Sequence, residues 1–126
     1  MIDELLEISL PEPDNFLKIK ETLTRIGVVS RGNKLTQTCH ILHKRGKYYI
    51  CHFRELFKLD GFERDITEDD LHRRNAITKL LQEWNLCEIV NPSKVEHSSM
   101  VKVKVVPYKD KHLYEFKANY TLGNKK

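Results

Sequence analysis

The sequence lacks any long apolar run, and its mean hydropathy is −0.54. A membrane-spanning helix requires about 20 consecutive apolar residues, so we expect no membrane span and no membrane partner. The first residues, Met1 to Glu4, include acids and no base, whereas a signal peptide begins with a basic region followed by an apolar one. We therefore expect a protein of the cytoplasm.

Glycine and proline are also scarce, at five and four residues, and no repeat or low-complexity segment occurs. A chain of 126 residues with this composition can close a modest core without disulfides or a structural metal. We expect a single domain that spans residues 1–126.

Cysteine is limited to Cys39, Cys51 and Cys87, and no C-x-x-C pair is present. This odd number without that spacing argues against a disulfide framework and fits a reducing compartment. Histidines lie near two of the cysteines, but their spacing matches no standard set of zinc ligands. A glycine-rich phosphate-binding loop and a nucleophile motif are both missing. We expect no metal, no cofactor, no small-molecule substrate and no enzymatic activity.

Charge is abundant and is distributed in blocks of alternating sign. The formal net charge is +4, yet residues 1–14, 15–59, 60–93 and 94–126 carry −5, +8, −4 and +5 respectively. Two basic blocks indicate a localised anionic partner if folding brings them together. Two solvated faces of an ordinary protein would explain the same pattern equally well.

Apolar periodicity predicts two main helices. The first runs from about Asn15 to Ile26, with Gly27 as its stop, and the second runs from a cap at Thr67 to about Trp84, whose ring we expect in the core. A shorter helix is predicted over 54–59. Strands are predicted over 4–10, 35–43, 47–53, 87–90, 101–105 and 113–121. The fold class is therefore α+β, with a helical core flanked by antiparallel β-sheets.

One solvent-facing side of the first helix carries Lys18, Thr22 and Arg25, which are four and then three residues apart. The two cations can neutralise phosphates, and Arg and Thr can also bond the base edges of unpaired nucleotides. An ordinary solvated helix face, with Glu21 bridging Lys18 and Arg25, is the alternative interpretation.

A basic turn, Lys44-Arg45-Gly46, joins two predicted strands, and its glycine can take a positive φ. The turn and the strand after it match the RNP1 segment of RNA-recognition motifs only poorly. Lys44 and Arg45 are the better candidates for phosphate contact. The adjacent Tyr48 and Tyr49 point to opposite faces of the sheet, so at least one is expected in the core.

Near the carboxyl end, Tyr108, Lys109 and Lys111 alternate rings and ammonium groups in the pattern that single-strand binding favours. The ring can stack on a base while the lysines follow the phosphates. A lysine-edged strand that is protected against aggregation is the alternative.

A set of short segments between about Ile8 and Asn124 carries a resemblance to a known family. These segments are residues 16–18, 20–25, 39–42, 48–50, 52–53, 88–90, 111–112, 120–121 and 123–124, together with Gly46, Trp84, Leu86 and Lys109. Taken together they resemble the RegA family, the translational repressors of T4-type bacteriophages. The resemblance covers nearly the whole chain.

The resemblance implies a function that the composition alone does not. Members of the family bind unpaired, often uridine- and adenine-rich mRNA near start codons and thereby exclude the ribosome, in the cytoplasm of the infected bacterial host. A homodimer is known in the family. The family's RNA contacts on the first helix correspond to Lys18, Thr22 and Arg25. Its RNA-proximal aromatic, a Phe, corresponds to Tyr108.

We therefore expect a translational repressor that occupies the initiation region of early phage mRNAs and blocks ribosome binding. The expected RNA-binding residues are Lys18, Thr22, Arg25, Lys44, Arg45, Tyr108, Lys109 and Lys111. The alternative function is a protein–protein interaction module that uses its alternating acidic and basic surfaces.

Overall fold

The computed structural model describes residues 5–30, 34–36, 38–61, 65–96, 104–107 and 114–115, with side chains for 5–27, 38–61 and 65–95. The helices and strands, in chain order, are β1 (Leu6–Ser9), α1 (Asn15–Arg25), β2 (Ile26–Ser30), β3 (Lys34–Thr36), β4 (Cys39–Lys44), β5 (Lys47–His52), α2 (Phe53–Leu59), α3 (Glu68–Glu83), β6 (Glu88–Ile89), α4 (Ser93–Glu96), β7 (Lys104–Pro107) and β8 (Tyr114–Glu115). No helix in these ranges is both long and apolar enough to cross a membrane.

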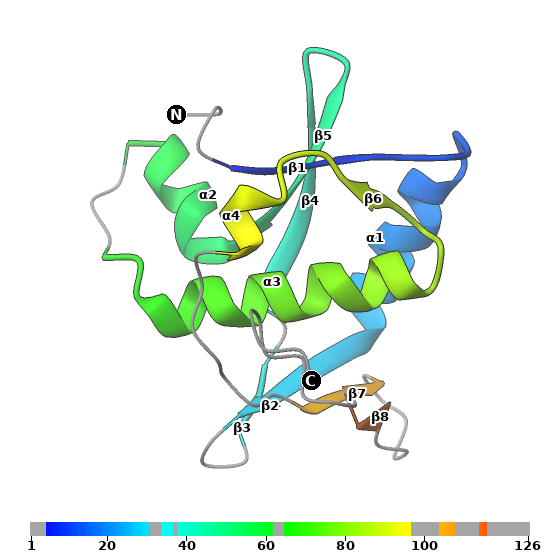
Figure 1. Cartoon of the computed structure of the whole chain (residues 1–126). Coiled ribbons are helices and arrows are strands. Elements are labelled where there is room, and N and C mark those ends of the chain that lie inside the picture. Colours follow the sequence, from blue (N-terminus) through cyan, green and yellow to red (C-terminus); the bar gives the residue numbers. More distant parts are fainter. Residues whose placement is uncertain are drawn as a thin grey trace.

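The strands in the described residues form two antiparallel sheets. The first sheet has the order β4-β5-β1-β6 and the second has the order β3-β2-β7-β8. Helix α3 crosses the middle of the molecule, with β1, β4 and β5 on one side and β2, β3, β7 and β8 on the other (Figure 1). The α+β class, with a helical core flanked by antiparallel sheets, is confirmed.

The first sheet is covered on both faces. On one face, Ile8 and Ile50 pack with Ile19 of α1 and with Ile77 and Leu81 of α3, all of them buried. On the other face, Tyr49 and Cys51 pack with Leu5 and are covered by Leu56 and Leu59 of α2. The predicted divergence of the two tyrosines is confirmed, since Tyr49 is buried and Tyr48 is only half-buried on the α1 side.

Helix α1 passes into β2 without a loop. Ile26 caps the helix with an extended backbone, φ −112° and ψ 152°, and is already the first residue of the strand. The prediction that Gly27 ends the helix was therefore wrong, because Gly27 lies inside β2 and pairs with Val106 of β7. The pairing of β2 with β7 also brings the two basic blocks of the sequence into one sheet.

Helix α3 begins as predicted. The Thr67 hydroxyl accepts a hydrogen bond from the Asp70 amide at 3.1 Å, and the Asp70 carboxylate accepts one from the Thr67 amide at the same distance. This capping box satisfies two amides that a helix start otherwise leaves without partners. The prediction that Trp84 lies in the core was wrong, because Trp84 is 41% exposed at the end of the helix.

Three further boundaries differ from the prediction. The strand expected over 35–43 is two strands, β3 in the second sheet and β4 in the first. Phe53, expected at the end of a strand, begins α2, because His52 caps that helix. Third, the region between the strands expected over 87–90 and 101–105 contains a short helix, α4, that was not predicted.

Candidate nucleic-acid interface

The exposed flank of α1 carries the first group of predicted RNA-binding residues. Lys18 and Arg25 are exposed and Thr22 is half-exposed, as the helical spacing requires. The Lys18 ammonium lies 3.8 Å from the Asp14 carboxylate, with both side chains more than half exposed, so this pair contributes little to stability. The Thr22 hydroxyl donates to the Lys18 carbonyl at 2.8 Å, which leaves its oxygen available as an acceptor. Within the described side chains, Glu21 forms no ion pair with Lys18 or Arg25.

The carboxyl end of this flank adjoins the second sheet. Ile26, which follows Arg25, pairs with Pro107 at the end of β7. Pro107 is the residue directly before Tyr108 in the sequence. The predicted RNA-binding residues Tyr108, Lys109 and Lys111 themselves lie outside the described residues.

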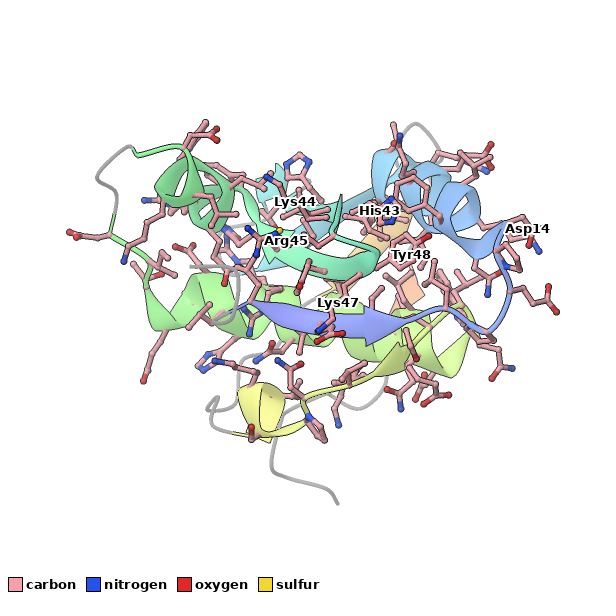
Figure 2. All side chains as sticks on the ribbon, turned by 90° about the horizontal axis from the view of Figure 1, so that it is seen from above. Asp14, His43, Lys44, Arg45, Lys47 and Tyr48 are labelled. Carbon is pink, nitrogen blue, oxygen red and sulfur yellow. The ribbon has the colours of Figure 1, made fainter. Side chains whose placement is uncertain are left out.

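The tip of the β4–β5 hairpin carries the second described group. Arg45 and Gly46 have φ of +54° and +76°, the signature of a two-residue type I′ turn. The predicted hairpin turn is confirmed. Lys44 and Lys47 are directly opposite one another across the strands, and all three cations are exposed. Figure 2 views this tip from above, with Lys44, Arg45 and Lys47 gathered around it.

The hairpin also presents a ring cluster that the sequence interpretation did not single out. We use "ring cluster" for Phe16, His43 and Tyr48. The His43 and Tyr48 rings are stacked, with centroids 4.3 Å apart and planes 12° apart, and Phe16 of α1 lies 5.3 Å from Tyr48 and 5.7 Å from His43. The Lys20 ammonium lies 5.2 Å from the centre of the Phe16 ring. A two-residue turn at 45–46 sets His43 opposite Tyr48, so the cross-strand pairing of these two rings could have been predicted from the turn.

The two groups of candidate residues lie on different sides of α1. Phe16 and Lys20 face the hairpin, whereas Lys18 is two residues further along from Phe16, which corresponds to about 200° around the helix axis. Thr22 and Arg25 share the side of Lys18. The structure therefore brings Lys44 and Arg45 together at the tip but does not place them on the same side of α1 as Lys18, Thr22 and Arg25.

Comparison with known proteins decides the family. The profile of a family described as bacteriophage translational regulator matches residues 5–123, nearly the whole chain. The chain belongs to this family. The expectation drawn from the sequence segments is thereby confirmed at the level of the family.

Individual relatives agree with the family assignment. The chain is 43% identical over 122 residues to the "Translation repressor protein" of Enterobacteria phage T4 and to that of Enterobacteria phage T6. The protein of the same name from Escherichia phage RB69 shows the same identity. In each comparison the match covers 95% of this chain and 100% of the relative.

Away from the basic surfaces, the protein contains a buried polar network between α2 and α3. His52 Nδ1 accepts a hydrogen bond from the Arg54 amide at 3.1 Å, and its Nε2 lies 3.4 Å from an Asp70 carboxylate oxygen. Burial of the ring lowers the pKa of His52 to about 4, although the Asp70 carboxylate acts in the opposite direction. Because Nδ1 is engaged in capping α2, the ring is held neutral with its proton on Nε2. This arrangement orients a helix rather than activating a nucleophile.

Glu55 and Arg74 complete this network. Arg74 donates to the Glu55 carboxylate at 2.7 Å and to the Asn75 side-chain oxygen at 2.8 and 3.0 Å, and all three residues are buried. Burial raises the pKa of Glu55, while the adjacent Arg74 lowers it. The pair therefore fastens α2 to the first half of α3. Helix α2 itself lies on the face of the first sheet opposite the ring cluster.

The three cysteines are free thiols in the interior. Burial raises the pKa of Cys39 and of Cys87 to about 12 and raises the pKa of Cys51 as well, so all three stay protonated at neutral pH. A protonated thiol is a poor nucleophile and a poor metal ligand. Among the described side chains, no group of three or more His, Cys, Asp or Glu residues is arranged to hold a metal ion.

Proposed function

We propose that this protein represses translation by binding unpaired RNA at the initiation region of phage messages, in the infected bacterial host, so that the ribosome cannot bind there. The observation that carries the proposal is the exposed row of Lys18, Thr22 and Arg25 on α1. That row ends at the pairing of Ile26 with Pro107, where the two basic blocks of the sequence meet. Membership of the translational regulator family and the name of the relatives support the same function.

Each described residue has a distinct role in the proposal. Lys18 and Arg25 neutralise phosphates along α1, and Thr22 accepts a hydrogen bond from a base or ribose through its free lone pairs. Lys44 and Arg45 add phosphate contacts from the hairpin tip. To bind a phosphate, the Lys18 ammonium gives up only its solvent-exposed ion pair with Asp14. An exposed ion pair stabilises a protein by no more than about 1 kcal/mol, so this exchange costs little.

Tyr108, Lys109 and Lys111 extend the proposed surface from the sequence pattern. The tyrosine stacks on a base and the two lysines follow the backbone of the strand. Tyr108→Ala is expected to weaken RNA binding by roughly 1 to 3 kcal/mol without changing the dependence on salt, because stacking releases no counterions. Normal binding by that variant would remove Tyr108 from the surface.

Repression in this proposal requires occupancy alone and breaks no bond. Incubation of labelled leader RNA with the protein, with and without a chelator, is expected to leave the RNA intact. Homodimer formation is a separate part of the proposal, which sedimentation of the free protein and of its RNA complex would test.

The test of the α1 surface compares Lys18→Ala with Lys58→Ala, which removes the same charge from an exposed position on α2. Binding to an A/U-rich single-stranded RNA containing AUG is measured over a range of salt concentrations. Lys18→Ala is expected to weaken binding and to reduce the slope of log K against log salt by about 0.7, the value for one single-strand phosphate contact. Lys58→Ala is expected to leave both unchanged. Equal behaviour of the two variants would contradict the assigned surface, and failure of the wild type to bind any RNA would contradict the function.

A further inference from the structure

The ring cluster beside the hairpin tip has an exposed member. His43 is exposed on β4, whereas Tyr48 and Phe16 beneath it are half-buried. Tyr48 supports one face of the imidazole ring at 4.3 Å in a nearly parallel stack, and Phe16 approaches both rings at a tilt. The imidazole is therefore held in a fixed orientation by packing, which lowers the entropy cost of stacking a further planar group on the cluster.

Among the described side chains, no acid pairs with the charges at the tip of the same hairpin. Lys44 and Lys47 are direct cross-strand neighbours, and like charges in that position are destabilising. Arg45 lies between them in a left-handed conformation that is unfavourable for any residue with a Cβ. None of these three cations forms an ion pair with a carboxylate in residues 5–27, 38–61 and 65–95. A bound anion would relieve the repulsion that the bare tip carries.

The rings and the lysine pair lie on opposite faces of the hairpin. His43 and Tyr48 form one rung of the ladder and Lys44 and Lys47 form the next, so their side chains point to alternate faces. In Figure 2, His43 and Tyr48 lie on the side of α1, and Lys44 and Arg45 lie farther from that helix. Only a ligand that passes across the tip can contact both the rings and the lysine pair. An unpaired polynucleotide can bend in this way and offer a base face, whereas the bases of a duplex are stacked on one another.

We propose that the hairpin tip is a second RNA contact, in which the ring cluster stacks on one unpaired base while Lys44, Arg45 and Lys47 hold the adjoining phosphates. Lys20, which lies over Phe16 on the same side, adds a positive charge next to that base. The proposal rests on the proposed RNA-binding function and deepens it. It makes His43 a base-contacting residue and places this contact on the side of α1 opposite Lys18.

The experiment compares His43→Ala, His43→Phe and the control His40→Ala. His40 is an exposed histidine of the same strand. It is three residues from His43, and because side chains alternate along a strand, it points to the face away from the rings. The probe is the A/U-rich single-stranded RNA containing AUG. His43→Ala is expected to weaken binding about fivefold to a hundredfold, the range measured for base–aromatic stacking, with an unchanged salt slope. His43→Phe keeps a ring and is expected to bind within about twofold of the wild type, as is His40→Ala.

A second arm of the experiment locates the base. RNAs made abasic at successive positions are bound to the wild type and to His43→Ala. At one position, the abasic RNA is expected to bind the wild type more weakly by the same factor as the His43→Ala substitution does with the intact RNA. At that position the abasic change is expected to cause no further loss of binding by the His43→Ala protein. Wild-type affinity of His43→Ala, or equal additional loss at every abasic position, would overturn the stacking proposal. The RNA-binding function stands in that case if Lys18→Ala still reduces the salt slope.

Discussion

The buried imidazole of His52 makes the stability of the fold depend on pH in a defined interval. The ring is fully buried, and its pKa falls from 6.5 to about 4 on folding, chiefly because burial disfavours the charged form. Well above pH 6.5 the ring is neutral in both the folded and the unfolded chain. Between pH 6.5 and about 4, His52 binds a proton in the unfolded chain but stays neutral in the folded protein. The free energy of unfolding therefore falls as the pH falls.

The size of this effect follows from the two pKa values. At about 1.4 kcal/mol for each pKa unit, the change from 6.5 to about 4 amounts to a loss of roughly 3 kcal/mol across the interval. That loss is a large fraction of the 5–15 kcal/mol by which a typical domain is stable. Glu55, whose folded pKa is raised, acts in the opposite direction, since protonation is easier in its folded state. The contribution of His52 must therefore be isolated with a variant.

His52→Asn is the matched variant, because Asn is a favourable N-cap and can still accept the hydrogen bond from the Arg54 amide. Urea unfolding of both proteins is followed by far-ultraviolet circular dichroism from just above pH 6.5 down to about pH 4. The wild type is expected to lose roughly 3 kcal/mol more than the variant over this interval, whatever their stabilities at neutral pH. If the free energies of unfolding of the two proteins changed in parallel with pH, the assignment of a lowered pKa to His52 would be refuted.

Three further predictions concern the core, the hairpin tip and the buried ion pair. Leu81→Ala is expected to lower the free energy of unfolding by about 2 to 5 kcal/mol in urea titrations, whereas Leu17→Ala, at a residue that is 59% exposed, is expected to change it by no more than about 0.5 kcal/mol. Arg45→Gly is expected to preserve or raise the thermal midpoint of unfolding, because glycine adopts a positive φ without strain. The same variant is expected to bind RNA more weakly and to reduce the slope of log K against log salt by about 0.7. An unchanged slope would remove Arg45 from the interface. Arg74→Met is expected to lower the free energy of unfolding by about 3 to 5 kcal/mol, because it leaves the Glu55 carboxylate buried without its guanidinium partner. Adding Glu55→Gln is expected to recover part of that loss. Simple additivity of the two changes in urea titrations would contradict the coupling.

The parts of the fold that depend on neighbouring residues could be predicted from the sequence. The apolar spacing of Ile19 and Leu23 predicts the buried face of α1, and the capping signal at Thr67 predicts the start of α3. The turn at Lys44-Arg45-Gly46 fixes the register of the β4–β5 hairpin in the same local way.

The parts that depend on distant residues could not be predicted. Gly27 has the local properties of a helix stop, but its pairing with Val106, far along the chain, makes it part of a strand. Phe16 completes the ring cluster only because α1 packs beside β4, a contact that no sequence pattern specifies. In the same way, the helical spacing predicted a shared side for Lys18, Thr22 and Arg25 but could not predict that the hairpin tip lies on the other side of the helix.

The absence of a linker between α1 and β2 makes the helix and the second sheet a single mechanical unit. The backbone of Ile26, which caps α1 and begins β2, therefore fixes the direction in which the strand leaves the helix. Insertion of one residue at this junction would shift the register of β2 against β3 and β7 by one position. Torque applied to the helix by a bound nucleic acid would for the same reason pass directly into the twist of that sheet.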